Sequence, residues 1–155
     1  MVSVDDLCSL IQKGGVFKDV EGTTVSEILS NAVSLIKLPA GLSRELLNTE
    51  LIEREKILST AVGNGIALPH PHRKVIDATD DQRIAVCFLK TPIDMQAPDS
   101  RKVYVYFILL TAASQKHIDI LSGIANLAKD KEFKLLLESC PDEATLLAGI
   151  RKCMA

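Results

Sequence analysis

Apolar residues recur at helical spacing near the start of the chain. They predict a short helix from Val4 to Ile11, ended by Gly14-Gly15, and then a brief strand from Val16 to Val20. Thr24-x-x-Glu27 has the form of a capping box, and the apolar positions after it have the spacing of one helix face: Val25, Ile28, Leu29, Ala32, Val33 and Ile36. This is the clearest helix start in the sequence.

A second helix is expected from Ser43 to about Leu58, with the Ser43 hydroxyl as its cap. Residues 62–71 follow as a loop and a short extended piece, because glycine disfavours helix and proline restricts the backbone. The Gly63-Asn64-Gly65 sequence lacks the spacing of a nucleotide-binding loop. We expect it to allow a close backbone approach near His70.

Two segments in the middle of the chain have the pattern of strands covered on both faces. Ile84–Leu89 and Val103–Leu110 are rich in β-branched and aromatic residues and are nearly all apolar. Such strands need helices on both sides of their sheet. Thr91-Pro92 and Ala97-Pro98-Asp99-Ser100 are expected to form turns between them.

The last third of the chain is predicted to be helical. Ser114 is expected to cap a helix to about Lys129, and Pro141 separates two short helices at Glu132–Glu138 and Asp142–Met154. Helices first, strands in the middle and helices again predict an α/β fold, a single three-layer domain over residues 1–155. Its mixed central sheet is flanked by helices on both faces. The pattern does not give the strand order.

The net charge and the lengths of the apolar runs limit the kinds of partner that this chain is expected to bind. A formal net charge of −2, from 18 basic and 20 acidic residues spread along the chain, lacks the footprint of a protein that binds nucleic acid or anionic membrane. The longest apolar run is far shorter than the roughly 20 residues that span a bilayer, so no membrane insertion is expected. Asp5 and Asp6 do not fit a signal peptide. We therefore expect a cytoplasmic protein, with Cys8, Cys87, Cys140 and Cys153 as free thiols.

Two polar residues fall on apolar helical stripes. Arg54 follows Leu47 and Leu51 on a stripe that would end at Leu58, so its guanidinium is expected to face inward and to need an anion. That anion is either a carboxylate at the rim, such as Glu50, or a phosphate.

His117 stands on the second stripe. Its apolar neighbours on the predicted helix face are Leu121, Ile124 and Ala128, so it is expected at the interior or its edge. A hydrogen-bonded core histidine and a catalytic imidazole both fit this position.

His70 and His72 form the third unusual site, in Leu68-Pro69-His70-Pro71-His72-Arg73. Proline fixes its own φ and biases the preceding residue toward extended backbone, so the two prolines around His70 should hold its backbone stiffly. Its imidazole could then be aimed at a partner. A plain surface turn is the alternative interpretation.

Three separated motifs resemble the type-2 enzyme IIA family of the bacterial phosphotransferase system, its mannitol/fructose and nitrogen-regulatory branch. Leu51–His70 looks like the active-site signature, with Arg54-Glu55 ahead of the glycine loop and Ala67-Leu68-Pro69-His70 at its end. Ser114–Ser122 resembles the second histidine motif. The resemblance extends from about Ser9 to Ile150, and it implies a phosphoryl carrier without a cofactor.

The resemblance also implies residue roles. His70 would accept a phosphoryl group from the histidine-containing phosphocarrier protein, Arg54 would anchor the phosphate oxygens and His117 would be a hydrogen-bond partner. The output would be regulation of target proteins, as in nitrogen-type enzyme IIA, or sugar transport through a IIB partner. This chain departs from the family by having Pro71 instead of a small residue after the histidine, which removes a backbone N–H.

Two other functions fit the same histidines. His70-x-His72 with a distant His117 has the spacing of a three-histidine zinc site that could activate water for hydrolysis, although Pro69 and Pro71 disfavour a regular strand there. A degenerate domain that binds partners without carrying phosphate is the other possibility, and Pro71 is its support.

Overall fold

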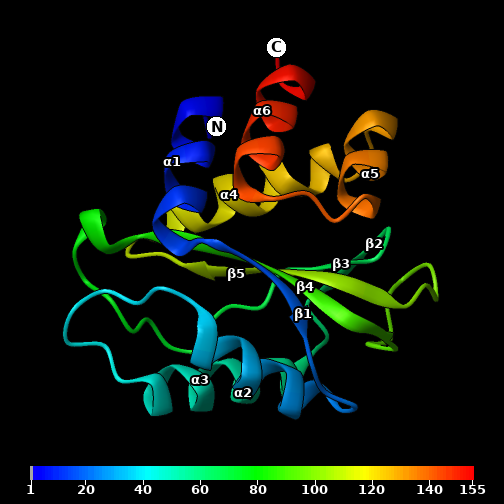
Figure 1. Ribbon diagram of the computed structural model, residues 1–155. Coiled ribbons are helices and arrows are strands. Elements are labelled where there is room, and N and C mark those ends of the chain that lie inside the picture. The colour runs from blue at the N-terminus through cyan, green and yellow to red at the C-terminus, as the bar shows by residue number, and fades with distance from the viewer. Residues whose placement is uncertain (1) are drawn as a thin grey trace.

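A five-stranded sheet separates two layers of helices in the computed structural model, which describes residues 2–155 (Figure 1). The helices of this described part are α1 (Val4–Gly14), α2 (Val25–Leu35), α3 (Arg44–Ile57), α4 (Ser114–Leu127), α5 (Lys131–Glu138) and α6 (Glu143–Cys153). The strands are β1 (Val16–Val20), β2 (Ala61–Gly63), β3 (Ile66–Ala67), β4 (Arg83–Ile93) and β5 (Val103–Leu110), with a short 3-10 helix at Thr79–Asp81.

The sheet is mixed. Its strand order is β1-β4-β5-β3-β2, in which β1 runs parallel to β4 and β3 runs parallel to β5. The pairs β4–β5 and β2–β3 are antiparallel. The predicted fold class, an α/β fold with a mixed sheet and helices on both faces, is therefore confirmed.

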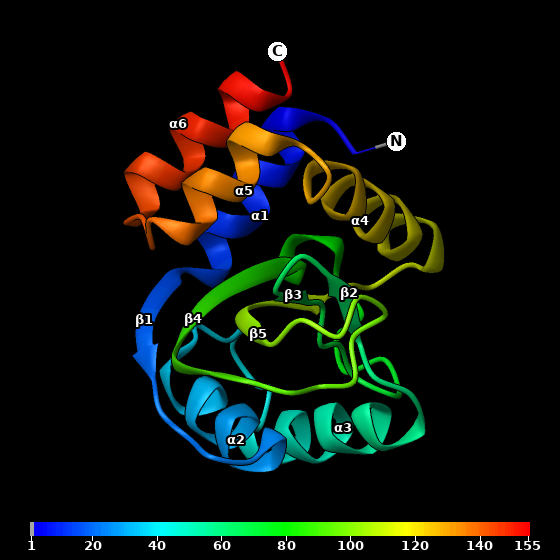
Figure 2. The ribbon, with the colours of Figure 1, turned by 90° about the vertical axis from the view of Figure 1, so that its right-hand side faces the viewer.

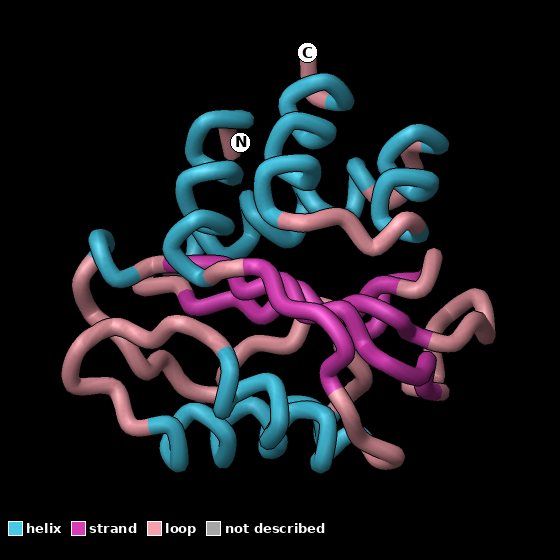
Figure 3. The backbone as a smooth tube through the Cα atoms, in the orientation of Figure 1, coloured by secondary structure: helices cyan, strands magenta, loops and turns pink. Residues whose placement is uncertain are grey.

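Side chains of β4 and β5 contribute to the apolar core on both sides of the sheet, because alternate residues of a strand point to opposite sides. Ile84 and Val86 of β4 pack with α1, α4, α5 and α6, which lie on one side of the sheet (Figure 2). Ala85 and Cys87 pack with α2 and α3 on the other side. The expectation of strands covered on both faces is confirmed, and Figure 3 shows the strand layer between the helices.

Of the predicted caps at Thr24, Ser43 and Ser114, the first two are confirmed. Thr24 and Glu27 form the complete capping box, and the Ser43 hydroxyl accepts from the Leu46 N–H at 3.2 Å. The expected cap at Ser114 is wrong. Ala113 has the extended backbone of the cap position and makes no side-chain cap, so Ser114 is already the first residue of α4.

The expected turn at Thr91-Pro92 is also wrong, because β4 continues through both residues to Ile93. The register between β4 and β5 shifts between Phe88 and Ile93, and a proline is tolerated at such an irregularity because its missing N–H breaks no regular ladder. The second expected turn is confirmed, since the Ser100 N–H donates to the Ala97 carbonyl at 3.0 Å.

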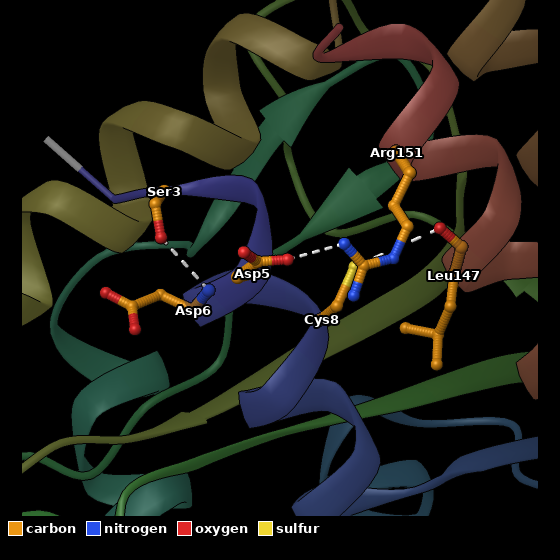
Figure 4. Close-up of polar contacts among 6 residues, drawn as sticks. All are labelled: Ser3, Asp5, Asp6, Cys8, Leu147 and Arg151. Carbon is orange, nitrogen blue, oxygen red and sulfur yellow. Dashed lines mark hydrogen bonds and ion pairs between the residues drawn. The ribbon is translucent and has the colours of Figure 1, made fainter.

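The first and last helices are joined by polar contacts (Figure 4). Arg151 of α6 donates to Asp5 of α1 at 2.6 Å, and the Cys8 thiol lies 3.9 Å from the Leu147 carbonyl. All four cysteines are free, as expected. Among residues 2–155, no helix combines the length and the apolar character needed to cross a membrane.

Candidate functional site

His70 follows β3 in an extended segment that is held on both sides. The Leu68 N–H donates to the Thr60 carbonyl at 3.0 Å, and the Leu109 N–H of β5 donates to the Pro69 carbonyl at 2.9 Å. His70 Nδ1 lies 2.8 Å from the Leu68 carbonyl oxygen. Because a carbonyl can only accept, Nδ1 carries the proton, and the neutral ring keeps its lone pair on Nε2.

His117 meets His70 although 47 positions separate them in the numbering of the chain. The two ring centroids lie 4.6 Å apart with an angle of 66° between the ring planes, an edge-to-face contact. His117 Nδ1 lies 3.1 Å from the Thr111 hydroxyl, which orients the second ring. Both rings are partly buried, so the prediction that His117 lies at the edge of the interior is confirmed.

The two imidazoles are shifted toward their neutral forms. Burial lowers the pKa of His70, the nearby Arg54 charge lowers it further, and the hydrogen bond to Leu68 acts in the opposite direction. Burial, His70 and Arg54 together lower the pKa of His117 to about 4. Near pH 7 both rings are therefore neutral, and His70 Nε2 is available as a nucleophile.

Arg54 lies on the α3 side of this pair, close enough for its charge to lower the pKa of both histidines. Its Nη1 donates to the Leu58 carbonyl at 2.6 Å rather than to a carboxylate. The predicted stripe is wrong at Leu58, whose side chain is 69% exposed. α3 ends at Ile57, and the extended backbone of Leu58 turns its side chain off the helix face.

Glu50 of α3, which the sequence offered as a possible partner of Arg54, pairs with the segment after His70 instead. Its side chain is buried, 6% exposed, and accepts from the Arg73 N–H at 2.8 Å, while its backbone carbonyl accepts from the His72 N–H at 3.0 Å. The Arg73 guanidinium lies 3.7 Å from the same carboxylate. Glu50 and the neighbouring Leu51 both lie on the buried side of α3.

A pocket of about 560 Å³ opens beside the two histidines. It is lined by residues of the His70 segment and of the β5–α4 connection: His70, Pro71, His72, Lys74, Val75, Thr111, Ala112, Ala113, Ser114, His117 and Ile118. His72 is exposed. Within the described part of the chain, no three or more His, Cys, Asp and Glu side chains are grouped so that they could hold a metal ion.

The close approaches that the glycine loop allows are to Tyr104 and Asp99. A Cβ on Gly65 would overlap the Tyr104 ring, and one on Gly63 would meet the Asp99 carboxylate. Asp99 also accepts from the Asn64 N–H at 2.8 Å. The positive φ angles of this loop close the β2–β3 hairpin, because they reverse the chain between two antiparallel strands.

Known proteins resemble this chain in both sequence and fold. A nitrogen regulatory protein of Pseudomonas aeruginosa is 29% identical over 143 residues, which cover 79% of this chain and 91% of that protein. The nitrogen regulatory protein IIA-Ntr of Neisseria meningitidis has the same fold, with a TM-score of 0.74 and 24% identity over 92% of this chain and 97% of that one.

Enzyme IIA for mannitol from Escherichia coli, solved in complex with phosphorylated enzyme IIB, also shares the fold. Its TM-score is 0.62 at 16% identity, over 89% of this chain and 94% of that one. The family model described as phosphoenolpyruvate-dependent sugar phosphotransferase system, EIIA 2, matches residues 9–153. This chain therefore belongs to the EIIA 2 family of the phosphotransferase system.

Proposed function

We propose that this chain is a phosphoryl carrier in which His70 Nε2 accepts the phosphoryl group from the histidine-containing phosphocarrier protein. The observation that carries the proposal is the meeting of two neutral histidines beside a cation: His70 and His117 in ring contact, with Arg54 close to both. An imidazole suits a shuttle, because its neutral nitrogen is nucleophilic near neutral pH and forms a covalent intermediate.

In the transfer step, the lone pair of His70 Nε2 attacks the phosphorus of the donor phosphohistidine. The new N–P bond forms as the donor N–P bond breaks, and the donor imidazole leaves neutral when its other nitrogen carries a proton. His70 keeps the proton on Nδ1, so its ring becomes cationic. The hydrogen bond to the Leu68 carbonyl at 2.8 Å is then charge-assisted, which stabilises the product.

Arg54 and His117 stabilise the transferred group. Phosphoryl transfer depends mainly on positioning and on charge stabilisation, and a guanidinium offers several donors to phosphate oxygens. His117 lies edge-to-face with the nucleophile and, through its bond to Thr111, is held where it can donate to the same oxygens. Pro71 contributes no N–H, so these side chains supply the donors.

The output is most simply regulatory: the carrier binds target proteins differently in its two phosphorylation states. The nitrogen regulatory relatives support this output. Transfer to a IIB partner is the second candidate, and the solved complex of mannitol IIA with phosphorylated IIB favours it. Incubation of the phosphorylated protein with a mannitol-type IIB domain separates the two, because only a transport-type IIA would pass on its label.

The test is labelling from radioactive phosphoenolpyruvate through the phosphocarrier, followed by mass mapping of the modified residue. Wild type and His72→Ala should be labelled, whereas His70→Ala should not. His72→Ala is the matched control, because His72 is exposed and only two positions away. Label that persists in His70→Ala would refute the assignment, and no label on wild type would leave the non-phosphorylated binding module.

A further inference from the structure

We propose that Glu55 of α3 is a positioning residue for His70: it fixes, through two intervening residues, the carbonyl that selects the protonated nitrogen of the His70 ring. This inference deepens the proposed phosphoryl-carrier function and rests on it for its consequence on rate. The hydrogen bonds that carry it do not depend on phosphorylation.

The first step of the path joins Glu55 to Thr60. One carboxylate oxygen of Glu55 accepts from the Thr60 N–H at 2.8 Å, and the other accepts from the Thr60 hydroxyl at 2.6 Å. Thr60 is 7% exposed and Glu55 is half-buried, so these bonds are partly shielded from water. Bonds to an ionised carboxylate are stronger than neutral ones, and two bonds on one residue fix its orientation as well as its place.

The second step joins Thr60 to the His70 segment. The Thr60 carbonyl accepts from the Leu68 N–H at 3.0 Å, and the Leu68 carbonyl lies 2.8 Å from His70 Nδ1. Thr60 and Leu68 flank the β2–β3 hairpin, so the hairpin is closed at its base by this bond. A shift of Thr60 would therefore move the carbonyl on which the His70 ring depends.

The position of the Leu68 carbonyl determines the tautomer of the His70 ring. Which imidazole nitrogen carries the proton is set by the hydrogen bond of the other one. With Leu68 in place, Nδ1 is protonated and Nε2 is free to attack. If the Leu68 carbonyl turns away, the proton can move to Nε2, and that fraction of the protein has no lone pair at the reacting nitrogen.

Arg54 supports the same segment from the preceding position. Its bond to the Leu58 carbonyl and the two Glu55 bonds to Thr60 together hold the chain as it leaves α3. The adjacent pair thus divides two tasks. Arg54 places a positive charge near the two histidines, whereas Glu55 positions Thr60 and, through it, the Leu68 carbonyl.

The test compares Glu55→Gln with Glu53→Gln in the full chain. Gln keeps the size of Glu but is neutral, so its oxygen can accept from the Thr60 N–H and its NH2 can only donate to the Thr60 hydroxyl, and both charge-assisted bonds are lost. Glu53 is exposed on the same helix and serves as the matched control. Long-range nitrogen-15 NMR of the unphosphorylated protein at pH 7.5 reports the His70 tautomer, and radioactive labelling reports the initial rate of phosphorylation.

We expect the Nδ1-protonated tautomer to dominate in wild type and Glu53→Gln, and a mixture in Glu55→Gln. Phosphorylation of Glu55→Gln should be about tenfold slower, since small misplacements of a reacting group have effects of at least this size. If Glu55→Gln does not fold, Thr60→Val removes the hydroxyl alone and should give a smaller shift in the same direction.

The outcomes separate this inference from the proposed function. An unchanged His70 tautomer in a folded Glu55→Gln or Thr60→Val variant overturns the positioning role, even where His70 is phosphorylated normally. If the His70 tautomer changes in Glu55→Gln but the wild-type protein takes no label at His70, the positioning role stands and the carrier function is overturned.

Discussion

The two helices that flank the site contribute to it in different ways. α3 holds the His70 segment by hydrogen bonds, with Glu55 bound to Thr60 before the histidine and Glu50 bound to the backbone after it. α4 contributes one ring contact, from His117, and borders the pocket. Under the proposed function, α3 therefore orients the His70 ring, whereas α4 leaves room for an incoming group.

The largest effect should come from the α3 side. Arg54→Lys should slow phosphorylation roughly 100-fold, the size seen when one preorganised donor to a developing negative charge is removed. Lysine keeps the charge but cannot reproduce a planar fork of donors. Arg101→Lys is the matched control, because Arg101 is exposed and its backbone N–H donates to the Asp99 carboxylate, which lysine can also do.

Rapid-quench measurement of the first turnover checks this expectation. An Arg54→Lys rate equal to that of Arg101→Lys would make the guanidinium structural, and its bond to the Leu58 carbonyl would then be its whole contribution.

The α4 side should show the next largest effect. His117→Ala removes one hydrogen-bond donor to the phosphoryl group, and such a bond to a charged group corresponds to about tenfold in rate. The same rapid-quench assay measures it, with His72→Ala as the control for the loss of a nearby imidazole. A rate loss as large as that of Arg54→Lys would contradict the division of labour between the two helices.

Much of this site could be predicted from local sequence. The prolines around His70 and the stripe position of His117 are visible in the chain, and the structure brings these rings into contact as the family resemblance implied. The fold class followed from the apolar periods of the helices and of β4 and β5. These features depend on near neighbours in sequence.

The predictions that were wrong concern the ends of helices or contacts between segments far apart in the sequence. Leu58 was placed on a buried stripe, but α3 stops one residue earlier. Ser114 was expected outside α4, and the register shift in β4 that accommodates Pro92 depends on pairing with β5. Glu50 was named only as a partner of Arg54, because its actual partners, the N–H groups of residues 72 and 73, lie beyond the hairpin.

The pH dependence of folding offers a second test of the α4 side. The folded-state pKa of His117 is about 4, below the ordinary value of about 6.5. Between these values the unfolded chain binds the extra proton and the folded chain does not, so stability falls as pH falls from about 6.5 to about 4. Above that window His117 contributes no pH dependence, because it is neutral in both states.

His117→Gln should flatten this dependence, since glutamine does not titrate. Urea unfolding followed by circular dichroism at pH 7, 5.5 and 4 measures it. Part of the slope should remain in His117→Gln, because burial also lowers the pKa of His70. An unchanged slope would show that the folded protein accommodates a charged His117.

The smallest effect is expected at Glu50, the second anchor on α3. Glu50→Gln keeps an oxygen for the Arg73 N–H and keeps the backbone carbonyl bonded to His72, but loses the ion pair with a guanidinium that is 82% exposed. Although Glu50 is buried, the Arg73 side of this pair is open to water and weakens it to about 0–1 kcal/mol, so the free energy of unfolding should fall by about 1 kcal/mol.

The rate of phosphorylation of Glu50→Gln should stay within about threefold of wild type. The rate falls only if the His70 ring is displaced, and this variant keeps its hydrogen bonds to the backbone after His70. Glu50 has no hydrogen-bond path to His70 Nδ1, whereas Glu55 has one through Thr60 and Leu68. Parallel labelling of Glu50→Gln and Glu55→Gln therefore asks whether α3 acts through the ring or only through the backbone. Equal rate losses would mean that both carboxylates merely hold the segment in place.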